Sequence, residues 1–224
     1  MLTIAKMGAH SVAYYQSTVD ENRGPDSYYS EDGKQPASVW LRGEKVAEVS
    51  AFLGAENGAV VSGKTVEDWF NKAVAPSGVK LGKALGDKGV PGFDLTFCAP
   101  KSVSLLWGMG VDSSVRSIVD EAHQAAVSQA LDYLSEHAGY TRKQDPAASK
   151  KRLIIEKLAG ISGVKYEHRT SRAGDPHVHS HVLLANKQLC QDGKARTLDG
   201  VSLYHEARAA GMVYQATVRG NRRS

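Results

Sequence analysis

The sequence predicts an α+β domain in which helices flank a central, largely antiparallel sheet. Stretches in which apolar and polar side chains alternate are separated by long stretches of helical periodicity, without the regular strand–helix–strand rhythm of a parallel sheet. The 224 residues, of which 42% are hydrophobic and 23% charged, suffice for one domain with a sizeable core. The sequence contains neither an internal repeat nor a long linker that would indicate a second domain.

In the first half of the chain, strand and helix signals alternate with long polar connections. Thr65 is expected to cap a helix, because Glu67 and Asp68 follow in its first turn. The expected elements are a strand over 2–6, a helix over 10–18, a polar loop over 19–37, a strand over 38–43, the helix over 66–74 and a glycine-rich connection over 77–92.

The second half begins with the alternating strand GFDLTFC and contains the longest predicted helix. Pro100 suits the first position of a helix that continues through KSVSLLWGM. The longest helix starts at Ser114 and reaches about His137, since apolar residues recur along one of its sides. The remaining expected elements are strands over about 153–167 and 177–186, a turn at 191–194 and a final helix over about 201–218.

Four of the eight histidines lie in one short stretch, HRTSRAGDPHVHSH. His177, His179 and His181 alternate with other residues, so an extended strand would place all three imidazoles on one face. The Gly, Asp and Pro before them have the composition of a tight turn, which would bring His168 back toward this row. Neutral imidazole is the commonest side-chain ligand of transition metals, and three such ligands leave coordination positions open for a substrate. The pattern predicts a metal site that takes part in chemistry.

The spacing leaves open which two of the three alternating histidines bind the metal. A single histidine in a strand is usually a surface or core residue satisfied by a neighbour, and only the repeat favours ligation. The chain has no HExxH helix, and its two cysteines, Cys98 and Cys190, are too few for a zinc finger. Two cysteines without a signal peptide indicate the reducing cytoplasm, and no apolar run approaches the ~20 residues that span a bilayer.

Basic residues are concentrated in one part of the chain, although the formal net charge is only +4. Nine Lys or Arg lie between Tyr140 and Arg172, against three acidic residues, and Arg169 is among them. A basic segment that leads into a histidine site favours a polyanionic substrate, with nucleic acid first. Basic runs are also often only solvated faces, so the charge alone does not decide.

Four of the nine tyrosines form two adjacent pairs near the N-terminus, Tyr14 with Tyr15 and Tyr28 with Tyr29. Hydrophobic packing seldom places paired tyrosines in so polar a segment, although surface anchors and base-stacking platforms are alternatives. A phenol can attack a phosphodiester and retain the cleaved strand as a phosphotyrosine, so the reaction is reversible. Because the ordinary pKa of a phenol is near ~10, the reaction at neutral pH requires a base or a metal-polarised phosphate.

Two further residues carry chemical signals in the block GFDLTFCAPKSVSLLW. Asp94 lies in an otherwise apolar strand, where a carboxylate usually has a partner. It is either a structural acceptor, a support for a metal-ligating imidazole, or a base for the tyrosine. Lys101 lies at the start of the next helix, where a cation and free backbone amides can meet a phosphate.

Together these features resemble the relaxase domain of conjugative plasmids, the TrwC/TraI (MobF) class of histidine-hydrophobic-histidine endonucleases. The resemblance rests on the tyrosine pairs, on GFDLTFCAPKSVSLLW and HRTSRAGDPHVHSHVLLAN, which are the specific blocks, and on RTLDG. It implies an antiparallel sheet flanked by helices, with metal-binding histidines on central strands. It also implies one relaxase domain over 1–224, carboxy-terminally shortened and without a helicase domain, in the bacterial cytoplasm.

The resemblance implies site- and strand-specific nicking and rejoining of single-stranded DNA at a plasmid transfer origin. Tyr14 would be the main nucleophile, leaving a 5′-phosphotyrosine, and Tyr28 the candidate for a later strand transfer. Tyr15 and Tyr29 would be secondary candidates. Relaxosome accessory proteins and a coupling protein are the expected partners, and no membrane segment is expected.

The resemblance also selects a ligand set. His168, His179 and His181 would ligate a divalent metal ion, with Mg²⁺ or Mn²⁺ expected and Zn²⁺ or Ni²⁺ as alternatives, and Asp94 would be the supporting carboxylate and base. The residues expected to hold the DNA are Lys101, Arg169 and Arg172.

The histidine block departs from the family pattern at three positions. Val178 and Ser180 replace the more usual Leu and Thr of the LHTH pattern, and His177 stands where related proteins carry Gln. His177 also forms an HVH pair with His179, so the choice of His179 and His181 rests on the resemblance.

Two other functions compete with nicking. A DNA-binding module would retain origin DNA without forming a covalent adduct. A metal-dependent phosphohydrolase for small substrates would keep its activity without the tyrosine nucleophile. The occurrence of paired tyrosines and a histidine row in one chain favours the nicking reaction.

Overall fold

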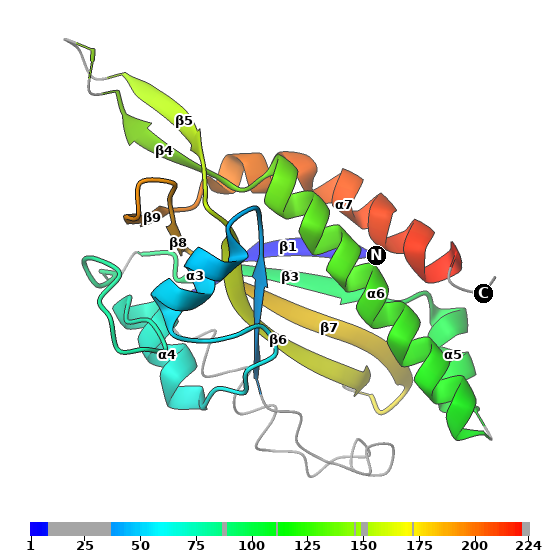
Figure 1. Cartoon of the computed structure of the whole chain (residues 1–224). Coiled ribbons are helices and arrows are strands. Elements are labelled where there is room, and N and C mark those ends of the chain that lie inside the picture. The colour runs from blue at the N-terminus through cyan, green and yellow to red at the C-terminus, as the bar shows by residue number, and fades with distance from the viewer. Residues whose placement is uncertain are drawn as a thin grey trace.

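The computed structural model describes residues 1–8, 37–86, 89–110, 112–145, 147–148, 152–171 and 173–220. Its centre is a five-stranded sheet with the order β1-β3-β7-β6-β2, in which every neighbouring pair is antiparallel (Figure 1). The predicted α+β class with a central antiparallel sheet is confirmed. The strands of this sheet are β1 (Leu2–Lys6), β2 (Ser38–Arg42), β3 (Gly92–Cys98), β6 (Ile161–Thr170) and β7 (Pro176–Ala185).

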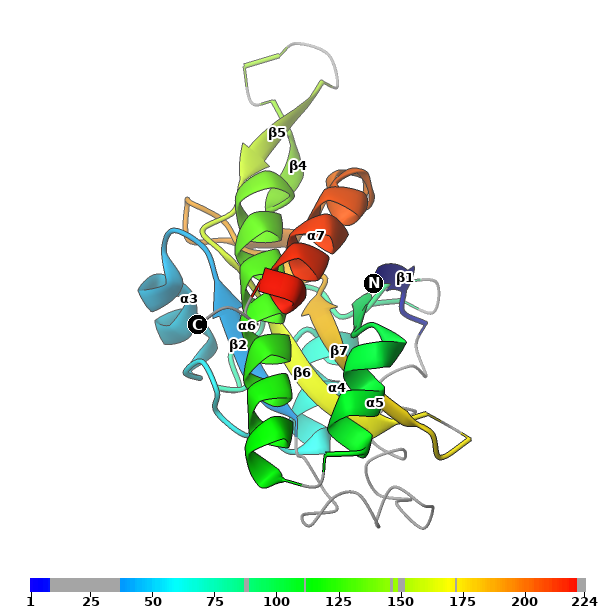
Figure 2. The same cartoon turned by 90° about the vertical axis from the view of Figure 1, so that its right-hand side faces the viewer.

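Helices cover both faces of the sheet (Figures 1 and 2). Three of them pack on one face, where α6 and α7 lie against each other, and two shorter helices pack on the opposite face. The first group comprises α5 (Lys101–Gly108), α6 (Ser113–His137) and α7 (Gly200–Gly220), and the second comprises α3 (Val46–Leu53) and α4 (Gly63–Lys72).

The alternation of the strands decides which side chains face which layer. In β3, Leu95 and Phe97 belong to the core beneath α5, α6 and α7, so Asp94 and its alternate neighbours face the other way. In β7, Val182 belongs to that same core, whereas Leu183 belongs to the core beneath α3 and α4. The odd-numbered residues of β7, including the histidine row, therefore lie on the face that carries α3 and α4.

Two two-stranded sheets lie outside the central sheet. A hairpin of β4 and β5 projects from the end of α6, and a smaller ribbon of β8 and β9 precedes α7 (Figure 1). The predicted turn at 191–194 lies within the smaller ribbon. The strands are β4 (Tyr140–Gln144), β5 (Leu153–Lys157), β8 (Lys187–Leu189) and β9 (Ala195–Thr197).

Several boundaries differ from the prediction. The expected strand over 153–167 is divided, because β5 pairs with β4 while β6 joins the central sheet. Ser62, and not Thr65, caps α4: its backbone is extended and its hydroxyl accepts a hydrogen bond from the amide of Thr65 at 3.1 Å. Pro100 is the cap residue before α5 and not its first helical residue. Helix α3 was not predicted, and the expected helix over 10–18 lies outside the described residues.

A buried polar contact joins both long helices to β7. The His123 ring of α6 lies between Tyr214 of α7 and Ser180 of β7, with 2.8 Å from Nδ1 to the phenol oxygen and 2.8 Å from Nε2 to the hydroxyl oxygen. All three side chains belong to residues with no exposed surface. Burial, with a smaller contribution from Arg169, lowers the pKa of His123 to about 3. None of the described helices is both long and apolar enough to cross a membrane.

The burial of His123 predicts a loss of stability in acid. The unfolded chain takes up a proton at this residue below the ordinary histidine pKa of 6.5, whereas the fold excludes that proton down to about pH 3. The contribution is therefore complete above pH 6.5 and declines as pH falls, with a loss of about 2 kcal/mol at pH 5. Urea unfolding of the protein and of His123→Phe between pH 5 and 7, with chelator present, measures this contribution. The unfolding free energy of the variant should depend less steeply on pH, by a slope that corresponds to about one proton. Equal slopes would contradict the assignment.

Candidate functional site

The site lies where β6 and β7 pair in the middle of the sheet. The register sets His168 directly opposite His179, and His181 lies on the same face two residues further along β7. The centroids of the three imidazole rings form a triangle with sides of 5.0 Å (His168–His179), 5.4 Å (His168–His181) and 5.4 Å (His179–His181). The structure therefore brings together the three histidines that the resemblance selects.

Asp94 joins this cluster from the neighbouring strand β3. Its carboxylate oxygens lie 3.1 and 3.0 Å from Nδ1 of His181. Thr96, two residues along the same face of β3, lies opposite His181, and its hydroxyl is 3.2 Å from both the Asp94 carboxylate and the His181 ring. Sequence reasoning missed Thr96, although the alternation of GFDLTFC places it beside Asp94.

Two of the rings have a defined tautomer. A carboxylate only accepts hydrogen bonds, so Nδ1 of His181 carries the proton that it donates to Asp94. Nδ1 of His179 lies 2.8 Å from the carbonyl oxygen of His177 and must likewise be the donor. In their neutral forms both rings therefore keep the lone pair on Nε2, the arrangement of a histidine that ligates a metal through Nε2.

His168 contributes a buried nitrogen without a partner. Its Nε2 has no hydrogen-bond partner among the described residues. Burial, followed by the charges of His181 and Arg169, lowers the pKa of His168 to about 4, and burial lowers the pKa of His179 to about 3. Both rings are therefore neutral at physiological pH, the form that binds a metal. An orphaned buried nitrogen beside two further Nε2 lone pairs fits a metal ion as the missing partner.

The rings are not yet arranged as ligands of one ion. Across the described ranges, no three His, Cys, Asp or Glu side chains already form a metal-binding group. The rings of His168 and His179 are stacked, with their planes only 25° apart. Ligation by both Nε2 atoms therefore requires at least one ring to turn about its side-chain torsions.

His177 and Lys101 lie at the edge of the cluster. The ring of His177 stacks on that of His179, with centroids 4.5 Å apart. Lys101 donates from Nζ to the carbonyl oxygen of Pro176 at 3.2 Å, so its ammonium group lies beside the start of β7. Burial, and then the positive charge of Lys101, lowers the pKa of His177. Lys101 thus lies at the rim of the histidine site, as a residue that holds a phosphate would.

Arg169 does not join the site. It lies on the opposite face of β6 from His168, with a side chain only 13% exposed. Its guanidinium pairs with Asp120 of α6 at 2.8 Å and with Glu167 at 3.0 Å, and Lys165 pairs with the same glutamate at 2.6 Å. The sequence-based interpretation of Arg169 as a DNA contact overlooked these partners, because its face of the strand is covered by α6.

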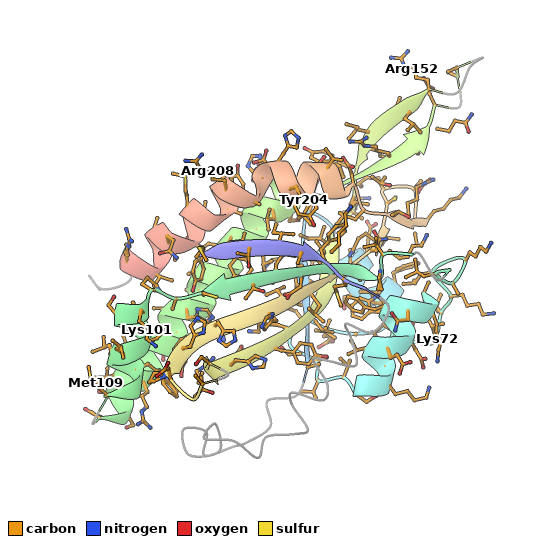
Figure 3. All side chains as sticks on the ribbon, turned by 180° about the vertical axis from the view of Figure 1, so that it is seen from behind. Lys72, Lys101, Met109, Arg152, Tyr204 and Arg208 are labelled. Carbon is orange, nitrogen blue, oxygen red and sulfur yellow. The ribbon has the colours of Figure 1, made fainter. Side chains whose placement is uncertain are left out.

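The basic segment is likewise divided by the fold. Its first part forms the β4–β5 hairpin, and Figure 3 shows Arg152 at the outer end of this hairpin and Lys101 at the other side of the molecule. Along β6, about 20 Å of extended chain separate the base of the hairpin from His168. The predicted residues Tyr14, Tyr15, Tyr28, Tyr29 and Arg172 lie outside the described residues.

The fold and the site define the class: an α+β protein with three clustered histidines and a carboxylate at the centre of an antiparallel sheet. A family model described as TrwC relaxase matches residues 8–223. The chain belongs to the TrwC relaxase family.

Individual relatives agree with this assignment. The chain is 30% identical over 172 residues to the multifunctional conjugation protein TraI of Escherichia coli, and 31% identical over 137 residues to TraI of strain K12. These matches cover 71% and 58% of this chain but only 9% and 7% of the relatives, so the chain spans a small part of their length.

Solved structures share the fold. The conjugative relaxase TrwC in a copper-bound complex with oriT DNA aligns over 99% of this chain and 69% of its own, with a TM-score of 0.76 and 24% identity. TrwC complexed with a 27-mer DNA comprising the recognition hairpin and the cleavage site gives a TM-score of 0.74 at 22% identity, covering 99% and 68%.

The tautomers give a first test of the site. We expect the neutral rings of His179 and His181 in the metal-free protein to carry their proton on Nδ1 and their lone pair on Nε2. Long-range ¹H–¹⁵N correlation spectra distinguish the two ring nitrogens. Asp94→Asn should remove the preference at His181 alone, because an amide can either donate or accept. Protonated Nε2 atoms in the parent protein would contradict the arrangement.

Proposed function

We propose that this chain is the catalytic domain of a metal-dependent relaxase, which nicks and rejoins one strand of DNA at a plasmid transfer origin. The observation that carries the proposal is the cluster of three histidines, two with Nε2 lone pairs fixed by their hydrogen bonds and one with a buried, unpartnered Nε2. Membership of the relaxase family and the likeness to TrwC structures with oriT DNA support it.

In this proposal His168, His179 and His181 hold one divalent ion through their Nε2 atoms. When bound, the ion polarises the scissile phosphate and stabilises the charge that develops on it. A set of three imidazoles suits Mn²⁺, Ni²⁺, Zn²⁺ or Cu²⁺ better than Mg²⁺, which prefers oxygen ligands. Asp94 orients the ring of His181 and increases its basicity as a ligand.

Tyr14 is the proposed nucleophile. Its phenolic oxygen bonds to the phosphorus, the bond from phosphorus to the 3′ oxygen breaks, and the departing 3′ oxygen takes up a proton. The 5′ phosphate remains on the tyrosine, and reversal of these steps rejoins the strand. Tyr28 is proposed for a later strand transfer, with Tyr15 and Tyr29 as secondary candidates. A role of Asp94 as the base for Tyr14 stays a prediction.

The proposed partners follow from the same chemistry. Single-stranded DNA near the cleavage site would pass the rim of the cluster, where the ammonium group of Lys101 lies beside β7. Because Arg169 is held in ion pairs behind the sheet, we assign it no DNA contact. Accessory proteins of a relaxosome and a coupling protein are the expected protein partners.

Covalent adduct formation tests the nucleophile. Labelled single-stranded oligonucleotide containing a transfer-origin nick site, incubated with protein and Mn²⁺, should give a protein–DNA band on a denaturing gel. Tyr14→Phe should abolish the band, because it removes the attacking oxygen, while DNA binding changes little. Tyr204→Phe is the matched control: this tyrosine is 40% exposed on α7, and its loss should leave the band unchanged. A strong band from Tyr14→Phe would refute the assignment, and tight binding without any band from the parent would favour the non-cleaving module.

Comparison of neighbouring histidines tests the ligand set. Gln is similar in polarity but a poor metal ligand, so His179→Gln should weaken Mn²⁺ affinity by at least about tenfold. His177→Gln, one strand repeat away, should bind Mn²⁺ within about twofold of the parent. Isothermal titration calorimetry measures both. If His177→Gln weakened Mn²⁺ binding more than His179→Gln, the ligands would be assigned to the His177–His179 pair instead.

A further inference from the structure

The first half of β7 is held by side chains of α5 and α6. Alternate residues in the first half of this strand each accept or donate one hydrogen bond to a side chain of α5 or α6, and a backbone group or hydroxyl of β7 is the partner each time. The bonds join Lys101 Nζ to the carbonyl of Pro176 at 3.2 Å, Ser104 Oγ to the amide of Val178 at 3.1 Å, and His123 Nε2 to Ser180 Oγ at 2.8 Å.

Two of these bonds, at Pro176 and Val178, lie beyond the regular ladders, whereas Ser180 is the first residue inside them, opposite Phe97 of β3 and Glu167 of β6. The pairing of β3 with β7 ends at Cys98 and His179. The regular pairing of β6 with β7 ends at His168 and His179, after which the register shifts before Thr170. The regular ladders on both sides of β7 therefore end at His179. Among the described residues, only the Thr170–Pro176 pair and the bond from the Ala99 amide to the Val178 carbonyl at 3.0 Å continue the pairing toward the start of the strand, so a twist there would displace the neighbouring ring of His179.

The contact between Ser180 and His123 can affect the orientation of two rings, those of His179 and His181. Ser180 lies between His179 and His181 in the chain and points to the opposite face. Its hydroxyl contacts His123 in a region with no exposed surface, where a hydrogen bond is strong and its loss costly. Tyr214 holds the other nitrogen of His123 at 2.8 Å, which fixes the orientation of that ring.

We propose that His123 is a positioning residue for the histidine cluster. Its bond to Ser180 fixes the rotation of β7 about its own axis, and thereby the direction in which His179 and His181 present their Nε2 atoms. The inference rests on the proposed function, because it takes these two histidines as metal ligands. His123 itself touches neither metal nor DNA and acts through the strand.

Metal affinity and thermal stability, measured on the same variants, test this role. His123→Phe keeps the ring volume but removes the bond, and should weaken Mn²⁺ affinity by about tenfold in calorimetry. Ser180→Ala should weaken it to a similar degree, and the double variant should lose no more than either single one, because all three remove one contact. Ser180→Thr, which keeps the hydroxyl, should restore affinity to within about twofold of the parent.

A destabilised control separates positioning from general support. Leu134→Ala lies on the same helix about three turns away, in the core, and should lower the melting temperature without changing Mn²⁺ affinity. If His123→Phe and Ser180→Ala behave like this control, His123 only stabilises the fold and the inference is overturned. If His123→Phe does not fold, Ser180→Ala, which deletes one oxygen, decides in the same way. Failure of the proposed metal site is distinct: the parent itself, or His179→Gln against the parent, would then show no specific Mn²⁺ binding.

Discussion

The two-residue alternation of β7 is the constraint on which the rest of the structure depends. One set of its residues carries the imidazole row, and the other set packs into the core beneath α5, α6 and α7. A slip of one residue in its pairing would turn the histidines toward α5, α6 and α7 and turn Val178 and Val182 toward the opposite face. Burial of the apolar set therefore fixes the register, and the register fixes the site. The same constraint sets His168 opposite His179, because β6 has its own buried set.

The cost of the site is the burial of imidazoles that have few partners. Burial lowers the pKa of His168 to about 4 and that of His179 to about 3, so the protein loses the option of charging them at neutral pH. Each ring gives up part of its hydration, and the nitrogen of His168 recovers no hydrogen bond among the described residues. A buried nitrogen without a hydrogen bond calls for an explanation, and this observation supports the proposed metal site over simple core packing.

The sequence predicted the strands of the central sheet, the long helices and the placement of the histidines, because these depend on local periodicity, but it did not predict β4, β8 or β9. Asp94 was identified for the same reason, as a carboxylate in an alternating strand. The sequence could not show contacts that come from another part of the fold: Arg169 resembles a free cation in the sequence, and only the fold shows that it pairs with Asp120 of α6. The hydrogen bond between His123 and Ser180 joins residues 57 positions apart, and no local sequence pattern predicts it. The division of the strand over 153–167 depended on where β4 lies.

The charges around the cluster explain why a metal ion and a phosphate belong together there. The Asp94 carboxylate is an acidic group within the cluster, and it repels a phosphodiester at short range. The cations nearest in sequence do not reverse this, since Lys165 and Arg169 are already paired with acids behind the sheet. Lys101 contributes a positive charge at the edge of the cluster, beside Pro176 at the start of β7. A divalent ion on the three histidines would add two positive charges beside Asp94, so the proposed metal would attract the substrate as well as activate it.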